Sequence, residues 1–366
     1  MHTKEETILQ FGAGNFLRAF VDVFVHEANS QDPSIGHVVA VQSTDSNRAQ
    51  MLNAQNGHYH VITRGLQNAQ KIDTQQHIQS ISRALIANTQ WSQVLDIGSS
   101  PDLRFITSNV TEAGLALTPN DSPQNPISFP GKLAQVLHAR YSKGLSGTYI
   151  VPCELVDRNG DLLQKLVLQQ ANIWHQDPDF ITYLQTENIW CNTLVDRIVS
   201  GRPDTHPLLE NDALLTVAEP FALWVIEKAH LFDHPAIQTV ENVDPYSLRK
   251  VRVLNGAHTA LVCKALPLGI KTVREAVEHP SVGPWLHDVI FEEIVPVVET
   301  QIEDIKSFAD QVTERFANPF LNHYLKDIAL HHNTKVQVRL LPTYREYLQQ
   351  FDKPPALLHK ILTDYL

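Results

Sequence analysis

The chain has 366 residues, a length that predicts two domains or one large one. Its hydrophobic fraction of 43% excludes a disordered or collagen-like chain, and its formal charge of −11 disfavours nucleic acid and anionic membranes as partners. No apolar run approaches the roughly 18 residues that cross a bilayer, and the N-terminus lacks a signal-peptide core. Three widely spaced cysteines indicate reduced thiols. We therefore expect a cytoplasmic globular protein, a monomer or small homo-oligomer, and most often an enzyme at this size.

The first forty residues predict a strand, a turn, a helix and a second strand. The apolar run 7–11 is the first strand, and segment 16–29 carries apolar residues at helical spacing. The β-branched run 38–41 is the second strand, and the turn GAGN at 12–15 separates the first strand from the helix. This order is what a parallel crossover requires.

The next part of the chain continues the alternation. Strands are expected at 103–107, 147–151 and 214–217, and helices at 131–141 and 162–174. Strands that alternate with helices predict an open, mostly parallel α/β sheet.

Helix-like segments predominate after about residue 220. Helices are expected at 222–231, 248–266 and 287–316, and the main strand-like run is 335–340. We place a domain boundary near residue 200. A mostly parallel sheet domain, 1–200, therefore precedes a mainly α-helical domain, 201–366.

The glycine turn predicts a dinucleotide site. Glycines let the backbone approach a pyrophosphate, and the following helix N-terminus offers N–H groups. Leu17 replaces the third glycine of the usual pattern, so a tight turn without a ligand is the alternative. The residues expected to bind the cofactor are Gly12, Ala13, Gly14, Asn15, Phe16, Gln42, Ser43, Asn109 and Thr111.

The residue that meets the adenosine ribose is expected just beyond the second strand. No carboxylate stands at that strand end. Asp45 is the nearest acid, with Gln42 or Ser43 as alternatives, and the nearest arginine is Arg48. The pattern therefore favours NAD over NADP.

The segment KVRVLNGAH, residues 250–258, carries candidate catalytic side chains. On a helix, Lys250, Asn255 and His258 project toward one side. A lysine with a lowered pKa takes an alcohol proton, an amide stabilises a developing alkoxide, and an imidazole holds a second hydroxyl. The alternative is a surface lysine followed by a helix-capping asparagine. The histidines show no recognisable metal-ligand spacing, so no metal is expected.

The same segment resembles the signature of the mannitol dehydrogenase family, the long-chain polyol dehydrogenases that need no metal. Further segments match in order and approximate spacing over nearly the whole chain: FGAGNFLRAF (11–20), SNVTEAG (108–114), SFPGKL (128–133), NTLVDRI (192–198), EPFALWVIE (219–227), RFANPF (315–320) and the stretch 335–342. The resemblance implies a Rossmann-type domain, a helical domain and an NAD-dependent dehydrogenase.

The family resemblance also implies roles for single residues. Lys250 would be the base in alcohol oxidation and the acid in ketone reduction, Asn255 would hold the reacting oxygen, and His258 would position the substrate. A second asparagine of the family is replaced here by Leu155. Asn159 is expected to take its place.

The segments GNFLRAF and PCELVDRNGD resemble most the family members that reduce tagaturonate. We therefore expect interconversion of a ketose-type sugar acid and its alcohol, with Arg249, Arg252, Lys335 or Arg339 holding the carboxylate. One alternative is a polyol 2-dehydrogenase of the mannitol or arabinitol type. Another is an NAD-binding protein with little activity, since family members usually continue well beyond the Pro342 segment.

Overall fold

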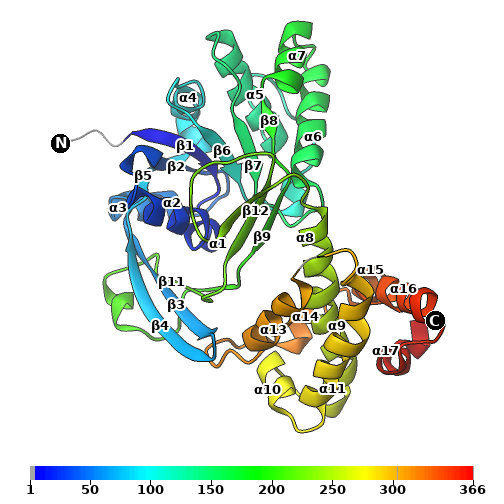
Figure 1. The fold of residues 1–366 in the computed structure, drawn as a ribbon. Coiled ribbons are helices and arrows are strands. Elements are labelled where there is room, and N and C mark those ends of the chain that lie inside the picture. The colour runs from blue at the N-terminus through cyan, green and yellow to red at the C-terminus, as the bar shows by residue number, and fades with distance from the viewer. Residues whose placement is uncertain (1–4, 303, 366) are drawn as a thin grey trace. The chain divides into compact units, whose positions relative to one another are not determined.

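The structure, a computed structural model, describes residues 5–302 and 304–365 and divides into two compact units (Figure 1). The first unit comprises the residues up to Thr63 together with Thr74–Val243, and the second comprises Arg64–Asp73 and the residues from Asp244 onward. The sequence placed a boundary near residue 200. The units instead divide after Val243, because four strands that follow residue 198 belong to sheets of the first unit.

The first unit is built on a six-stranded sheet with the order β5-β2-β1-β6-β7-β8. Its strands are β1 (Glu6–Phe11), β2 (His37–Gln42), β5 (Ile81–Ile86), β6 (Phe105–Ser108), β7 (Tyr149–Pro152) and β8 (Ile189–Trp190). All neighbouring pairs are parallel. Taken in chain order, this is the 3-2-1-4-5-6 arrangement of the Rossmann fold. The predicted parallel sheet is confirmed.

The two faces of this sheet are covered by different elements, because alternate residues of a strand point to opposite sides. Leu9 and Val39 pack with helices α4, α5 and α6 in one core. Ile8 and Val38 pack with α2 and with Trp224 of β12 in the other. The helices of this unit are α1 (Asn15–Arg18), α2 (Val21–Asn29), α3 (Arg48–Ala54), α4 (Ala87–Gly98), α5 (Phe129–Ser142), α6 (Asn159–Ile173) and α7 (Pro178–Thr186).

Two smaller sheets complete the strands. One has the order β13-β12-β9 and the other β10-β11-β3-β4. Their strands are β3 (Tyr59–Gln67), β4 (Gln70–Ile78), β9 (Thr193–Asp196), β10 (Val199–Gly201), β11 (Thr216–Ala218), β12 (Leu223–Glu227) and β13 (Ile237–Val240). The predicted helix at 222–231 is wrong. Its LWVIE run is the central strand β12, in which every residue is buried. Because neither face of the strand is polar, the sequence lacks the alternation that distinguishes a strand from a buried helix.

The predicted helix 16–29 is divided into α1 and α2. In a continuous helix the carbonyl oxygens of Arg18 and Ala19 would accept from amides four residues on. Here the Tyr59 hydroxyl donates to the Arg18 carbonyl at 2.7 Å, and Arg197 Nη1 donates to the Ala19 carbonyl at 2.7 Å. These long-range donors replace the helical bonds, and the chain turns at Phe20.

Asp22 of α2 is a buried carboxyl group in this region. Gln10 Nε2 and the Tyr59 hydroxyl donate to its Oδ2 at 3.3 and 3.4 Å. Burial raises the pKa of Asp22 from 3.8 to about 7, although these hydrogen bonds and the Arg18 charge oppose the shift. The folded state therefore prefers the protonated carboxyl. The resulting stabilisation is complete below the unfolded pKa of 3.8 and is lost as the pH rises through about 7.

We expect Asp22→Asn to remove this pH dependence. Between about pH 5 and about pH 8, the free energy of unfolding of the unmodified protein should fall by about 2 kcal/mol more than that of the variant. Denaturant unfolding at both pH values measures the difference. Asp45→Asn, at an exposed carboxyl, is the control and should follow the unmodified protein. Equal pH slopes for the unmodified protein and Asp22→Asn would contradict the assignment.

The second unit is helical, as predicted. Its helices are α8 (Asp244–Arg249), the π-helix η4 (Lys250–Asn255), α9 (Gly256–Ala265), α10 (Val273–Glu278), α11 (Val282–Asp288), the π-helix η6 (Val289–Ile294), α12 (Val295–Val298), α13 (Ile305–Phe316), α14 (Leu325–Ile328), α15 (His332–Arg339), α16 (Leu341–Phe351) and α17 (Ala356–Leu362). The tip of the β3–β4 hairpin joins this unit through Glu314 of α13, whose carboxylate accepts from the amides of Asn68 and Ala69.

Two predicted elements of this unit are wrong. The run 335–340 alternates polar and apolar residues, yet it lies in helix α15. Val336 and Leu340 are buried four residues apart, while Val338 is 54% exposed, so the helical period governs burial. The expected helix 287–316 is not continuous: helical residues run through Pro296 to the end of α12 at Val298, and α13 begins at Ile305. None of the helices described over 5–302 and 304–365 has the length and apolar character to cross a membrane.

Candidate functional site

A cavity of about 650 Å³ opens at the carboxyl ends of β1, β2 and β6 in the first unit. This edge of a doubly wound sheet is where such folds bind ligands. All nine residues that the sequence assigned to a cofactor line it: Gly12, Ala13, Gly14, Asn15, Phe16, Gln42, Ser43, Asn109 and Thr111. The fold thus brings residues from three separate loops to one place.

The two glycines of the turn have different tasks. Gly12 has φ +132°, a conformation that L side chains rarely adopt, and a Cβ there would lie 2.9 Å from Leu17 Cδ1. Gly14 has φ −75°, and a Cβ there would meet nothing within 4 Å. Gly12 therefore makes the tight turn, and Gly14 leaves bare backbone facing the cavity. Both features suit a pyrophosphate held against the main chain.

Gln42 lines the cavity, but its amide holds the loop that follows β2. Its Nε2 donates to the carbonyls of Thr44, at 3.0 Å, and of Ser46, and its Oε1 accepts from the Ala49 amide at 2.8 Å. Asn109 similarly donates from its side chain to the Cys153 carbonyl at 2.7 Å. These two side chains shape the cavity walls through the backbone that they support.

Sequence reasoning missed several polar residues of the cavity. Thr44, Ser46, Arg48 and Lys132 all line it. Lys132 donates to the Ile127 carbonyl at 2.6 Å, and burial lowers its pKa. Lys132 lies in the SFPGKL segment, which is one of those that resemble the family, so the sequence did contain a pattern that could have identified it. The other three lie just beyond the second strand.

Asn159 does not occupy the place expected of it. It is fully buried at the start of α6, where its Nδ2 lies within hydrogen-bond distance of the Pro152 and Glu154 carbonyls and of Thr193 Oγ1. Its Oδ1 accepts from the Thr193 amide at 2.9 Å. The side chain therefore ties the end of β7 to β9, and no part of it is open to a substrate. The expectation of a catalytic Asn159 is corrected accordingly.

In the second unit, Lys250 and Asn255 are the first and last residues of the π-helix η4. Hydrogen bonds in a π-helix join residues five apart, so residues at that spacing lie on the same side of the helix. An α-helix would instead align residues four apart. The π turn thus aligns Lys250 with Asn255, and His258 follows three residues later on α9. Such turns occur frequently at functional sites.

His258 is buried in an aromatic and cationic setting. Its ring stacks on Phe316 at 4.3 Å between centroids and meets His323 edge-on at 4.8 Å. Burial lowers the pKa of His258 well below its usual value, and the nearby charges of His323, Arg315, Arg339 and Lys335 lower it further. The imidazole is therefore neutral at physiological pH.

Two polar groups on this helix lack a protein partner. His258 Nε2 is buried and forms no hydrogen bond in the part of the chain that the structure describes. The side-chain amide of half-buried Asn255 likewise has no hydrogen-bond partner among residues 5–302 and 304–365. Buried polar groups are normally satisfied, so the unpartnered Nε2 of His258 makes this helix a candidate ligand site.

The four basic residues expected to hold a carboxylate differ in their surroundings. Arg252 is buried and donates to Thr343 Oγ1 at 2.9 Å and to Glu346 at 2.5 Å, so it ties α16 to the π turn. Arg252 is therefore engaged by protein partners in this structure. The Arg249 guanidinium lies over the rings of Tyr246 and Phe308, at 5.0 and 4.3 Å.

Lys335 is the expected basic residue whose charge acts on His258, and Arg339 acts with it. Both lie on α15 and are half-buried, and burial lowers the pKa of each. Lys335 Nζ donates to the Ile328 carbonyl at 2.7 Å, and Arg339 Nη1 contacts Thr259 Oγ1 at 3.5 Å. Neither the Ile328 carbonyl nor the Thr259 hydroxyl is negatively charged, so neither contact neutralises the positive charge of Lys335 or Arg339.

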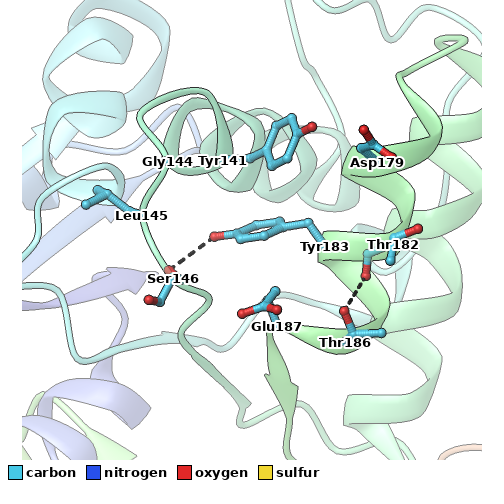
Figure 2. A pocket seen from close by; sticks show the side chains of 9 residues that line it. All are labelled: Tyr141, Gly144, Leu145, Ser146, Asp179, Thr182, Tyr183, Thr186 and Glu187. Atoms are coloured by element: carbon cyan, nitrogen blue, oxygen red, sulfur yellow. Dashed lines mark hydrogen bonds between the residues drawn. The ribbon is translucent and has the colours of Figure 1, made fainter.

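A second cavity of about 450 Å³ lies between the end of α5 and helix α7 (Figure 2). The Tyr183 hydroxyl donates to the Ser146 carbonyl across it at 3.2 Å. Two carboxylates, Asp179 and Glu187, line it, and no basic side chain is among its lining residues. This cavity therefore does not suit an anionic cofactor. Within the described ranges, no group of three or more His, Cys, Asp or Glu residues is placed to hold a metal ion.

The fold and its cavity define the class: a Rossmann-type dinucleotide-binding protein with a helical unit that carries a lysine, an amide and an imidazole. Residues 6–239 match the Mannitol dehydrogenase Rossmann domain, and residues 242–363 match the Mannitol dehydrogenase C-terminal domain. The chain belongs to the mannitol dehydrogenase family. The two matches meet where the structure divides, next to Val243.

Known proteins give closer relatives within this family. An altronate oxidoreductase of Halalkalibacterium halodurans is 40% identical over 374 residues, covering 96% of this chain and 73% of that protein. One of Bacillus subtilis is 40% identical over 375 residues, covering 96% of this chain and 77% of its own length. The sequence resemblance to the family is thereby confirmed.

Solved structures agree on the fold. A substrate-free D-sorbitol dehydrogenase superposes with a TM-score of 0.85 at 22% identity and covers 98% of this chain and 81% of its own. The Pseudomonas fluorescens mannitol 2-dehydrogenase ternary complex with NAD and D-mannitol gives 0.79 at 20% identity, over 99% of this chain and 78% of its own. Both comparisons support the sheet-then-helix architecture.

Proposed function

We propose that the chain is an NAD-dependent dehydrogenase that interconverts a ketose-type sugar acid and its alcohol, of the tagaturonate and altronate type. The observation that carries this is the surroundings of His258. The Asn255 side-chain amide and His258 Nε2 have no hydrogen-bond partner among the described residues. The positive charges of Arg315, Arg339 and Lys335 act on the His258 imidazole. Such a setting suits a polyhydroxylated anion. The relatives named altronate oxidoreductases support the same substrate.

The cavity of the first unit fits the cofactor. It combines bare backbone at Gly14, a tight turn at Gly12 and two basic side chains, Arg48 and Lys132. Backbone amides and positive charges are what a pyrophosphate requires. Bound NAD supplies hydride acceptance at its nicotinamide, and the protein supplies orientation and proton transfer.

In the proposed mechanism, the Lys250 amine takes the proton of the substrate hydroxyl during oxidation and returns it during ketone reduction. The Asn255 amide donates a hydrogen bond to the reacting oxygen, where negative charge develops. Neutral His258 positions the substrate through a neighbouring hydroxyl. Because its pKa is lowered, His258 keeps this role without gaining a charge as the pH falls through its usual titration range.

The carboxylate of the substrate is assigned to Arg339 and Lys335. A guanidinium binds a carboxylate by paired hydrogen bonds, and a charge-assisted bond of this kind is worth about 1.5–3 kcal/mol. A neutral polyol offers no such partner. The proposed site therefore discriminates sugar acids from polyols through α15.

A substrate panel with Arg339→Met tests this assignment. We expect the unmodified protein to turn over tagaturonate with NADH and not to turn over fructose. In Arg339→Met, the KM for tagaturonate should rise at least roughly tenfold. Arg345→Met removes an exposed arginine of the same unit and should change neither parameter. Turnover of fructose instead would favour a mannitol- or arabinitol-type polyol dehydrogenase. NADH binding without any turnover would favour a protein with little activity.

We assign the protein to the cytoplasm. Cys153, Cys191 and Cys263 are all free thiols, of which two are buried, and burial raises the pKa of each. Unpaired thiols suit a reducing compartment. A hydrophobic setting that keeps them protonated also makes them poor nucleophiles.

A further inference from the structure

We propose that the cofactor cavity contains a subsite for a phosphate group on the adenosine ribose, so that the protein binds NADP(H) as well as NAD(H). The subsite is formed by Ser43, Thr44, Ser46 and Arg48, which follow β2 and line the cavity. The inference rests on the proposed function in one respect, namely that this cavity holds the adenosine half of a dinucleotide.

Arg48 supplies the positive charge of the subsite. It is the first residue of α3, it is exposed, and it lines the cavity. Within residues 5–302 and 304–365, its guanidinium takes part in no ion pair and no hydrogen bond. Its donors are therefore available to a ligand. The sequence alone favoured NAD because no arginine adjoins the second strand, but the structure places Arg48, from beyond that strand, in the cavity lining, where an arginine accommodates a ribose 2′-phosphate.

Hydroxyl groups surround this charge. Ser46 Oγ is buried and has no hydrogen-bond partner in the described part of the chain. The side-chain hydroxyls of Ser43 and Thr44 also form none among the described residues, whereas the Thr44 and Ser46 carbonyls are held by Gln42. The Gln42 amide thus fixes the loop, while the hydroxyls of Ser43, Thr44 and Ser46 stay available to a ligand. Hydroxyls and a guanidinium together match the acceptor oxygens of a phosphate monoester.

A carboxylate in this cavity would reject a 2′-phosphate. NAD-selective sites place a carboxylate beyond the second strand, where it accepts from the ribose hydroxyls and repels a phosphate. No described side chain among the residues that line this cavity is an aspartate or glutamate. Asp45 lies in the loop but is exposed and not part of the lining. The charged side chains among the described lining residues, Arg48 and Lys132, are both basic.

Two nucleotides that differ only in the phosphate test the subsite directly. Adenosine 2′,5′-bisphosphate and adenosine 5′-monophosphate are titrated into the full chain by calorimetry, without any turnover. We expect the bisphosphate to bind at least as tightly as the monophosphate. Arg48→Ala should weaken bisphosphate binding about tenfold relative to the monophosphate, the loss of one charge-assisted contact.

Two further variants sharpen the test. Ser43→Asp introduces the missing carboxylate and should reverse the preference, so that the monophosphate binds more tightly. Lys165→Ala removes one charge from an exposed site on α6 of the same unit and should leave the ratio of the two affinities unchanged. It controls for the general effect of net charge.

The possible outcomes separate this inference from the proposed function. Bisphosphate binding that is about tenfold weaker than monophosphate binding in the unmodified protein would overturn the inference and leave the dinucleotide site intact. An Arg48→Ala variant that weakens both nucleotides equally would also overturn it. Failure of both nucleotides to bind would overturn the inference and the proposed cofactor site together.

Discussion

Replacing Lys250 by alanine is expected to lower kcat for tagaturonate reduction by about 10²–10⁴-fold. In the proposed mechanism the Lys250 amine accepts and returns the substrate proton, and the methyl group of alanine cannot do either. The π turn places this residue on the same side of the helix as Asn255, where both can meet one substrate oxygen. Steady-state kinetics with NADH measures the loss.

The control is Lys271→Ala, which removes an exposed lysine of the same unit and should retain full activity. A small primary amine added to the Lys250→Ala variant should restore part of the rate, because the missing group is then supplied from solution. A merely structural lysine would show no such rescue. If Lys250→Ala keeps more than about a tenth of the activity, its assignment as acid and base is wrong.

Asn255→Ala is expected to lower kcat by about 10²–10³-fold, with a smaller change in KM. The amide has no hydrogen-bond partner among the described residues, so its removal leaves no protein group unsatisfied. Its proposed donor role matters most when negative charge develops on the reacting oxygen. The split between kcat and KM therefore distinguishes this role from simple substrate binding.

Asn255→Asp keeps the shape of the side chain but replaces a donor by an acceptor, and it should be at least as inactive as the alanine variant. Asn322→Ala, at an exposed asparagine of the same unit, serves as the matched control and should be fully active. Near-normal kcat in Asn255→Asp would show that the amide does not contact the reacting oxygen. Melting temperatures of all three proteins verify that folding is unchanged.

The candidate site was predictable where it depends on local sequence. The turn at Gly12 and Gly14 lies between a buried strand and a helix, and local pattern alone places it at the carboxyl end of β1. The contribution of Asn159 was not predictable in this way. The amides of Gln42 and Asn159 are both used by backbone groups, and for Asn159 these include Thr193 on β9. The Asn159 partner on β9 is distant in sequence, so a local pattern does not contain it, whereas the Gln42 partners lie in the loop that its amide holds or just after it.

The amino-acid sequence by itself determined the alternation of strands and helices, the glycine turn, and the spacing from Lys250 to His258. It did so because hydrophobic periodicity and glycine conformation act within a few residues. Only the tertiary structure decided that LWVIE is a central strand and that KVQVRL is helical. LWVIE is buried on both faces of its sheet, and KVQVRL is buried along one face of a helix, and in each case burial overrides local preference. The tertiary structure likewise decided that a π turn aligns Lys250 with Asn255, and that the charges of α15 reach His258.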